Sequence, residues 1–116
     1  MKRILIAEDN DSNYTLMTYI LKRHYEFVRA CNGQEAVDMV DTEKLDLVLM
    51  DLKMPVMGGL EATRQIKAKI PSMPIIALTA NAFDTDKEDA ANAGCNDFLS
   101  KPVSSKICLD TIAKYI

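Results

Sequence analysis

The stretch Leu47-Val48-Leu49-Met50-Asp51 is an unbroken apolar run that ends on a carboxylate. A strand with one face in water would carry a polar residue at every second position, and this run carries none. Strands of this kind are covered on both faces and occur in parallel sheets with helices above and below. The stretch therefore predicts a central strand of an α/β fold, and it places one acidic side chain at the strand's carboxyl end.

Other apolar runs recur along the chain, and a segment with helical features follows each of them. The expected strands span residues 4–7, 27–31, 45–50, 74–79 and 97–100. Five strands that alternate with five helices predict an α/β fold with a parallel sheet. The preference for right-handed crossovers restricts the order in which the strands can lie.

The connecting segments carry the signals that start and stop helices. Asn10 offers a capping side chain before the first helix, whose apolar face is expected to continue as far as His24. Gly59 opens a third helix with a face of small residues, Gly94 ends the fourth, and the fifth begins near Ser104. These segments are long enough to cross from one parallel strand to the next.

Length and composition exclude several classes of protein. The chain has 116 residues and a formal net charge of −3, which fits one domain and leaves no room for a second. No apolar run is long enough to span a membrane, and the scattered Lys and Arg residues argue against direct nucleic-acid binding. The three cysteines lack the spacing of a disulfide framework or a zinc site, and no signal peptide is evident. We therefore expect a cytoplasmic domain without membrane contact.

Residues that could bind a metal or a phosphate stand at the carboxyl ends of four of the expected strands. They are Glu8, Asp9, Asp51, Thr79, Ala80 and Lys101. Because ligands bind outside the carboxyl ends of the strands in such sheets, these residues are expected to share one site. Crowded carboxylates repel each other unless a cation compensates, and oxygen ligands suit Mg²⁺. A carboxylate, a metal, a hydroxyl and an ammonium group together favour phosphoryl transfer, with Asp51 as the nucleophile.

Four segments resemble the receiver domains of two-component response regulators. The segments are ILIAEDN at 4–10, LVLMDLKMPVMGG at 47–59, IIALTANA at 75–82 and DFLSKP at 97–102. The resemblance covers residues 4–116 and implies one receiver domain over residues 1–116. It also implies a (βα)5 flavodoxin-like fold with strand order 2-1-3-4-5.

The resemblance assigns a metal site to the acidic residues. Asp51 would accept a phosphoryl group from a histidine kinase or a histidine phosphotransfer protein. Asp9 would bind Mg²⁺ directly and Glu8 through water, and the backbone carbonyl of Lys53 would be a further ligand. The acidic pair Glu8-Asp9 departs from the commoner Asp-Asp of the family.

The resemblance also assigns phosphate-binding and switching roles. The Thr79 hydroxyl, the Ala80 amide and the Lys101 ammonium group would bind phosphoryl oxygens, and the bond from Lys101 to Pro102 is expected to be cis. Phe98 would be the aromatic residue that moves with Thr79 on activation, although the family more often has Tyr there. The fourth helix, fifth strand and fifth helix would then form a regulated partner surface or a homodimer interface.

The sequence also resembles receivers that are fused to hybrid sensor histidine kinases. The chain ends within its last helix, so any output is expected from another chain or a missing part. Lys53 and Asn81 stand two residues after Asp51 and Thr79, where we expect their side chains to set the lifetime of the phosphoryl group.

Three other functions are possible for such a fold, and the residues of this chain fit them less well. An aspartyl-phosphate phosphatase has a second Asp two residues after its nucleophile, where this chain has Lys53. A flavodoxin-like cofactor binder needs a phosphate-binding loop after the first strand, where Glu8 and Asp9 would repel phosphate. A receiver used only for docking does not need the Asp51, Thr79 and Lys101 set that this chain keeps. The domain by itself is not expected to be an enzyme.

Overall fold

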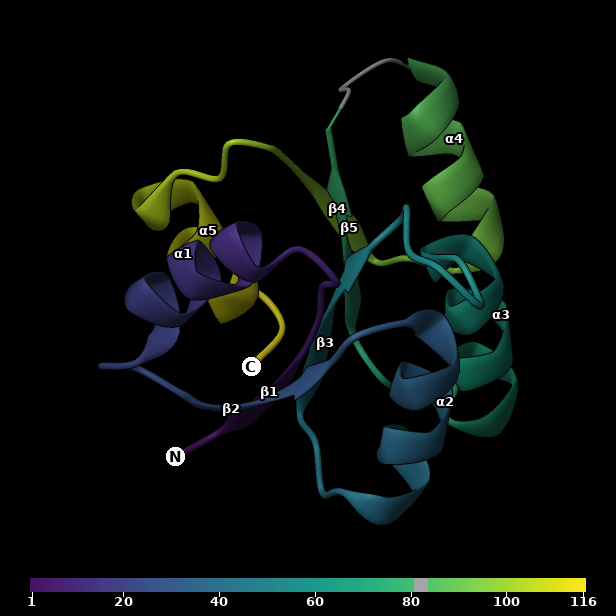
Figure 1. Cartoon of the computed structure of the whole chain (residues 1–116), viewed down its shortest axis with the longest axis horizontal. Helices are drawn as coiled ribbons and strands as arrows, with labels where there is room; N and C mark the ends of the chain where they lie inside the picture. The colour runs from purple at the N-terminus through teal and green to yellow at the C-terminus, as the bar shows by residue number, and fades with distance from the viewer. Residues whose placement is uncertain (81–83) are drawn as a thin grey trace.

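The computed structural model describes residues 1–80 and 84–116, with side chains for 1–80 and 86–116. Five strands form one parallel sheet in the order β2-β1-β3-β4-β5 (Figure 1). The strands are β1 (Arg3–Ala7), β2 (Glu26–Ala30), β3 (Leu47–Asp51), β4 (Ile75–Thr79) and β5 (Asp97–Ser100). The predicted fold class and strand order are therefore confirmed.

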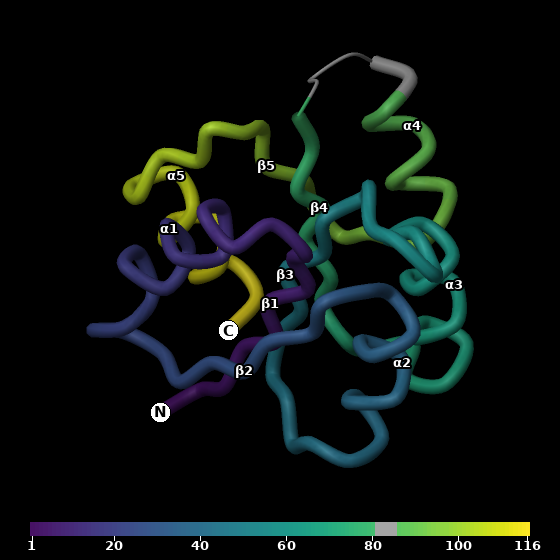
Figure 2. Tube along the Cα trace, in the orientation of Figure 1, coloured from purple at the N-terminus to yellow at the C-terminus, as the bar shows by residue number. Residues whose placement is uncertain are grey.

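Helices cover both faces of the sheet. They are α1 (Asp11–Leu21), α2 (Gly33–Thr42), α3 (Gly59–Lys69), α4 (Asp84–Ala93) and α5 (Ser105–Ala113). Helices α1 and α5 lie on one face, and α2, α3 and α4 lie on the other, as the chain trace in Figure 2 shows. Among the described helices, none combines the length and the apolar composition that a membrane span requires.

Two apolar cores, one on each face of the sheet, explain why the central strands are apolar at almost every position. Ile4 and Ile6 of β1 pack against α1 and α5, while Leu5 and Ala7 pack on the other side against α2 and α3. Strand β3 alternates in the same way, and all of its residues are buried. Burying one such aliphatic side chain stabilises a fold by about 1.5–3 kcal/mol.

Several element boundaries differ from those expected. Strand β3 begins at Leu47 and includes Asp51, which is paired with Leu78 of β4 in the ladder. Helix α1 ends at Leu21, whose backbone carbonyl accepts the N–H groups of His24 and Tyr25 in a turn. His24 is exposed and lies outside the helix. The boundaries differ because backbone pairing in the sheet and the turns at helix ends set them. The apolar pattern of the sequence encodes neither.

Side-chain caps fix where the helices begin. Asn10 accepts the backbone N–H of Asn13 at 2.9 Å, which starts α1 directly after the acidic pair. Ser104 accepts the N–H of Ile107 at 3.5 Å in the same way at α5. The predicted small-residue face of α3 is confirmed, since its buried residues are Gly59, Ala62, Thr63 and Ile66.

Candidate functional site

A pocket of about 360 Å³ opens at the edge of the sheet where the parallel strands end. Every residue that the sequence predicted as a metal or phosphate ligand lines it. The lining residues are Glu8, Asp9, Asn10, Asn13, Asp51, Leu52, Lys53, Leu60, Leu78, Thr79, Ala80, Asp86, Asp89 and Lys101. The strand order therefore brings together residues that are far apart in the sequence.

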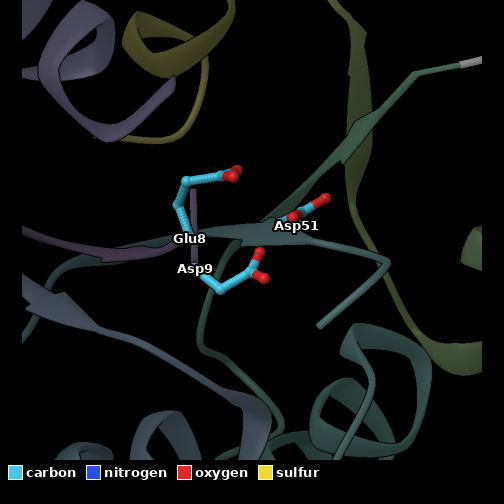
Figure 3. Close-up of side chains that lie close together, drawn as sticks. All are labelled: Glu8, Asp9 and Asp51. Atoms are coloured by element: carbon cyan, nitrogen blue, oxygen red, sulfur yellow. The ribbon is translucent and has the colours of Figure 1, made fainter. Parts of the chain in front are cut away.

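Three carboxylates meet in this pocket (Figure 3). One oxygen from each of Glu8, Asp9 and Asp51 lies within 4.8 Å of the others. Glu8 is 1% exposed and Asp51 is 6% exposed, while Asp9 is open to solvent. Glu8 continues the alternation of Ile4 and Ile6 and therefore turns toward α1 and α5, whereas Asp9 turns the other way.

The electrostatics of the cluster favour a bound cation. Burial, and next the charge of Glu8, raise the pKa of Asp51 to about 6, although Lys101 opposes the shift. A divalent cation among the three carboxylates would remove this penalty. The donors are all hard oxygens, which fit Mg²⁺, so the residues present match the metal that the sequence predicted.

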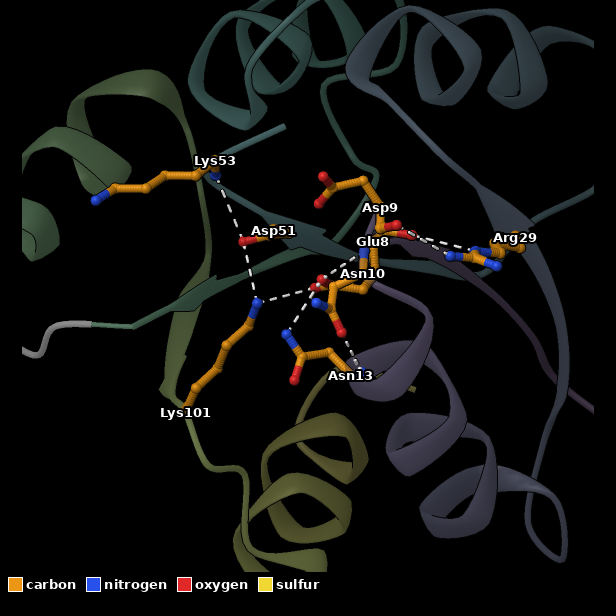
Figure 4. Close-up of polar contacts among 8 residues, drawn as sticks. All are labelled: Glu8, Asp9, Asn10, Asn13, Arg29, Asp51, Lys53 and Lys101. Carbon is orange, nitrogen blue, oxygen red and sulfur yellow. Dashed lines mark hydrogen bonds and ion pairs between the residues drawn. The ribbon is translucent and has the colours of Figure 1, made fainter. Parts of the chain in front are cut away.

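Lys101 bridges two of the carboxylates across the pocket (Figure 4). Its Nζ donates to Glu8 Oε2 at 2.9 Å and lies 3.3 Å from Asp51 Oδ1. Burial lowers the pKa of Lys101, but the hydrogen bond to Glu8 and the charge of Asp51 outweigh burial and raise it. The Lys101–Pro102 peptide bond is cis, which confirms the prediction.

Glu8 is held by more than its ion pair. Its Oε1 accepts the backbone N–H of Asn10 at 3.2 Å and the Nδ2 of Asn13 at 3.4 Å, while Oε2 faces Lys101. Both oxygens of this buried carboxylate therefore have donors. The Glu8 side chain anchors Lys101, and the exposed Asp9 is the carboxylate most open to an incoming ion.

The backbone around Asp51 is packed closely. The backbone N–H of Lys53 donates to Asp51 Oδ1 at 3.4 Å, which curves the chain away from the strand end. Gly59 at the start of α3 sits so close that an added Cβ would lie 2.8 Å from Leu52 Cα. The missing side chain of Gly59 is what lets the helix approach the end of β3.

Two predicted residues are not among those that the pocket brings together. Phe98 is half-buried and lies outside the pocket, where Lys87 Nζ sits 4.7 Å from the centre of its ring. Asn81 lies outside the described residues. Thr79 and Ala80 line the pocket from the end of β4, with Thr79 buried and Ala80 exposed.

Sequence reasoning missed several residues at the site. Asn13, in the first turn of α1, donates to the Glu8 carboxylate, and Asp86 and Asp89 of α4 line the rim of the pocket. Arg29 of β2 donates its Nε–H to the backbone carbonyl of Glu8 at 3.1 Å. A charged residue in the interior of strand β2, after Phe27 and Val28, was the available signal for Arg29.

Comparison with known proteins agrees with the geometry. The chain matches the response regulator receiver domain family over residues 4–113. It is 36% identical to the polar-differentiation response regulator DivK of Brucella anthropi, over 99% of this chain and 96% of DivK.

Solved structures give the same result. The receiver domain of the sensor histidine kinase PA1611 from Pseudomonas aeruginosa, which has a magnesium ion in its active site cleft, is 36% identical with a TM-score of 0.92. The match covers 98% of this chain and 96% of that one. The receiver domain of Saccharomyces cerevisiae Ssk1, solved with the phosphotransfer protein Ypd1, is 35% identical with a TM-score of 0.92, covering 98% and 88%. The chain belongs to the response regulator receiver domain family of two-component signalling.

Proposed function

We propose that Asp51 accepts a phosphoryl group from a phosphohistidine donor. The observation that carries the proposal is the position of the Asp51 carboxylate, which ends the buried strand β3 inside an acidic pocket, 3.3 Å from the ammonium group of Lys101. This transfer requires a nucleophile, a positively charged side chain held in position, and hydrogen-bond donors for the phosphoryl oxygens.

The transfer itself needs little chemistry from the protein. One Asp51 oxygen forms a bond to phosphorus as the bond from phosphorus to the imidazole nitrogen breaks, and that nitrogen keeps the electron pair. Lys101 stays charged and binds one phosphoryl oxygen, while the Thr79 hydroxyl and the Ala80 amide bind others. These groups act by position and charge, because the transition state spreads its charge over those oxygens.

Mg²⁺ would be held by Asp9 and Asp51, with the Lys53 carbonyl as a further ligand and Glu8 acting through water. The ion supplies positive charge where the incoming phosphoryl oxygens gather. The carboxylate oxygens that lie within 4.8 Å of each other support this assignment, as does the raised pKa of Asp51.

The response to phosphorylation would run through Thr79 and Phe98. A phosphoryl group on Asp51 draws the Thr79 hydroxyl, and Phe98 turns inward into the space that this leaves. Lys87, which lies over the ring of Phe98, would stabilise the outward position. The change is a population shift at the α4, β5 and α5 surface, which would then bind a partner or a second copy of the chain.

The relatives support a histidine-containing protein as the donor. Ssk1 was solved with a histidine phosphotransfer protein, and PA1611 is a sensor histidine kinase. A histidine kinase or a phosphotransfer protein in the cytoplasm is therefore the donor that we propose, and the similarity to the PA1611 receiver is compatible with a place in a hybrid kinase. The domain would promote only its own phosphorylation and dephosphorylation.

A small phosphodonor tests the proposal without the cognate kinase. The chain is incubated with acetyl phosphate, with Mg²⁺ or with a chelator, and its intact mass is measured over time. We expect one phosphoryl group per chain with Mg²⁺ and far less without it. If the mass does not change in the presence of Mg²⁺, the proposal is wrong.

A further inference from the structure

The guanidinium group of Arg29, on the edge strand β2, joins three parts of the junction between β1 and α1. Its Nε donates to the Glu8 carbonyl at 3.1 Å, and one terminal nitrogen donates to the Asp9 carbonyl at 3.4 Å (Figure 4). The same terminal nitrogen donates to Asp11 Oδ1 at 2.8 Å. One side chain therefore contacts consecutive residues of the loop that carries the acidic pair.

The packing around Arg29 fixes the direction of its side chain. Arg29 shares a sheet face with Phe27, and the Tyr14 ring of α1 contacts both residues. The Tyr14 and Phe27 rings meet edge to face with centroids 6.4 Å apart, and the guanidinium carbon lies 4.3 Å from the Tyr14 centroid. The Arg29 side chain is only 24% exposed. A stacked, largely covered guanidinium group presents its donors in a fixed direction.

We propose that Arg29 is a positioning residue for the metal site. The two carbonyls that it binds belong to the two acidic residues of the cluster, so it sets the path of the backbone from which their carboxylates extend. Its ion pair with Asp11 also joins it to the first residue of α1. The inference rests on the proposed Mg²⁺ site and adds a residue that does not touch the ion.

The sign of the effect separates positioning from charge. Arg29 is a cation near an acidic site, so simple electrostatics predicts that its removal strengthens Mg²⁺ binding. If Arg29 instead holds Glu8 and Asp9 in place, its removal weakens Mg²⁺ binding, as loss of a partner that orients ligands generally does. The two explanations therefore predict opposite changes of the same dissociation constant.

The experiment is a calorimetric titration of the whole chain with Mg²⁺ alone. We expect Arg29→Gln to raise the dissociation constant by about tenfold, the lower end of the usual range for such partners. Arg29→Lys keeps the charge but cannot reach both carbonyls at once, so it should also bind Mg²⁺ more weakly than the wild type. In phosphorylation by acetyl phosphate, Arg29→Gln should need more Mg²⁺ while the rate at saturating Mg²⁺ is retained.

Arg3→Gln is the matched control. Arg3 is a partly covered arginine whose guanidinium pairs with Glu43 at 2.7 Å, at the opposite end of β1. Its replacement removes a comparable ion pair and should leave the dissociation constant for Mg²⁺ unchanged. All titrations are run at a temperature at which thermal unfolding shows every variant to be folded, and Arg29→Lys carries the test if Arg29→Gln does not fold.

The outcomes are distinct. Unchanged or tighter Mg²⁺ binding in both Arg29 variants overturns the positioning role, and so does an equal loss in Arg3→Gln. If the wild type itself binds no Mg²⁺, the proposed metal site fails before Arg29 is considered.

Discussion

At the scale of single residues, Asp51 carries the largest electrostatic cost in the site. Its pKa rises from 3.8 to about 6, first because it is buried and then because Glu8 is charged. The folded chain therefore holds a proton on Asp51 more tightly than the unfolded chain does. Ionised Asp51 lowers the stability of the fold as pH rises from about 4 to about 6, and the loss is complete above that range.

Asp51→Asn should consequently stabilise the fold at neutral pH. We expect its free energy of unfolding at pH 7.5 to exceed that of the wild type by on the order of 3 kcal/mol, since the pKa rises by about two units and one unit is worth ~1.4 kcal/mol. The difference should shrink toward pH 4.5. Urea unfolding with Mg²⁺ chelated measures both values.

Asp89→Asn is the control, because it removes an exposed carboxylate from the rim of the same pocket. It should change stability much less than Asp51→Asn. An Asp51→Asn chain that is less stable than the wild type at pH 7.5 would contradict the electrostatic account of the site.

The sequence predicted which residues meet at the site but not how they pair. Asp51 and Lys101 were identifiable because both stand at the ends of expected strands. The bond from Lys101 to Glu8 was not, since it joins side chains 93 residues apart. Such pairings depend on the strand order and on side-chain direction, which no local pattern contains.

At the scale of elements, the approach of α3 to β3 shapes the site. Gly59 begins α3 against the backbone of Asp51 and Leu52, and an added Cβ would meet that backbone. Because backbone atoms cannot turn aside as a side chain can, a substitution must push α3 away from the end of β3.

Gly59→Ala should therefore destabilise the chain by about 1–3 kcal/mol and slow its phosphorylation. Gly58→Ala is a matched control in the neighbouring position, where the added Cβ would lie 3.4 Å from Leu52 O, an ordinary contact. Thermal unfolding and the rate of phosphorylation by acetyl phosphate distinguish the two variants. Equal effects of both substitutions would show that the close approach at Gly59 has no special role.

Element ends that carry a residue-specific signal were predictable, and ends without such a signal were not. The helix start at Asn10 and the stop at Gly94, whose φ is +111°, were predictable because caps and positive φ angles have residue preferences. The end of α1 was not, because the apolar spacing continues to His24 while the chain has already turned.

At the scale of the whole molecule, we expect the fold to persist without the metal. Two apolar cores, one on each face of the sheet, hold it together. At the proposed site, Mg²⁺ would bind only the folded arrangement of Glu8, Asp9 and Asp51, and it should therefore add stability by mass action. The melting temperature should rise with Mg²⁺ concentration, and chelation should lower it without unfolding the chain.

Asp9→Asn should weaken this response to Mg²⁺, since it removes the exposed carboxylate of the cluster. Differential scanning fluorimetry across a series of Mg²⁺ concentrations measures the effect, with Asp38→Asn on α2 as a control outside the pocket. A melting temperature that is independent of Mg²⁺ in the wild type would argue against a metal site among these carboxylates.

The fold as a whole was predictable because its main determinants are regular. Alternating strands and helices, with unbroken apolar runs at 47–50 and 75–78, define a covered parallel sheet. The contacts of Arg29 with the backbone of Glu8 and Asp9, and the place of Asp86 and Asp89 at the pocket rim, were not predictable, because they arise only when separate elements come together at one edge.

The position of the phosphoryl group tests the central claim most directly. The chain is phosphorylated with acetyl phosphate and Mg²⁺, digested, and its peptides are sequenced by tandem mass spectrometry, with Asp51→Asn treated in parallel. We predict one modified residue, Asp51, in the wild type and no phosphoryl group in the variant. A phosphoryl group on another residue of the wild type, or equal incorporation in Asp51→Asn, would contradict the account.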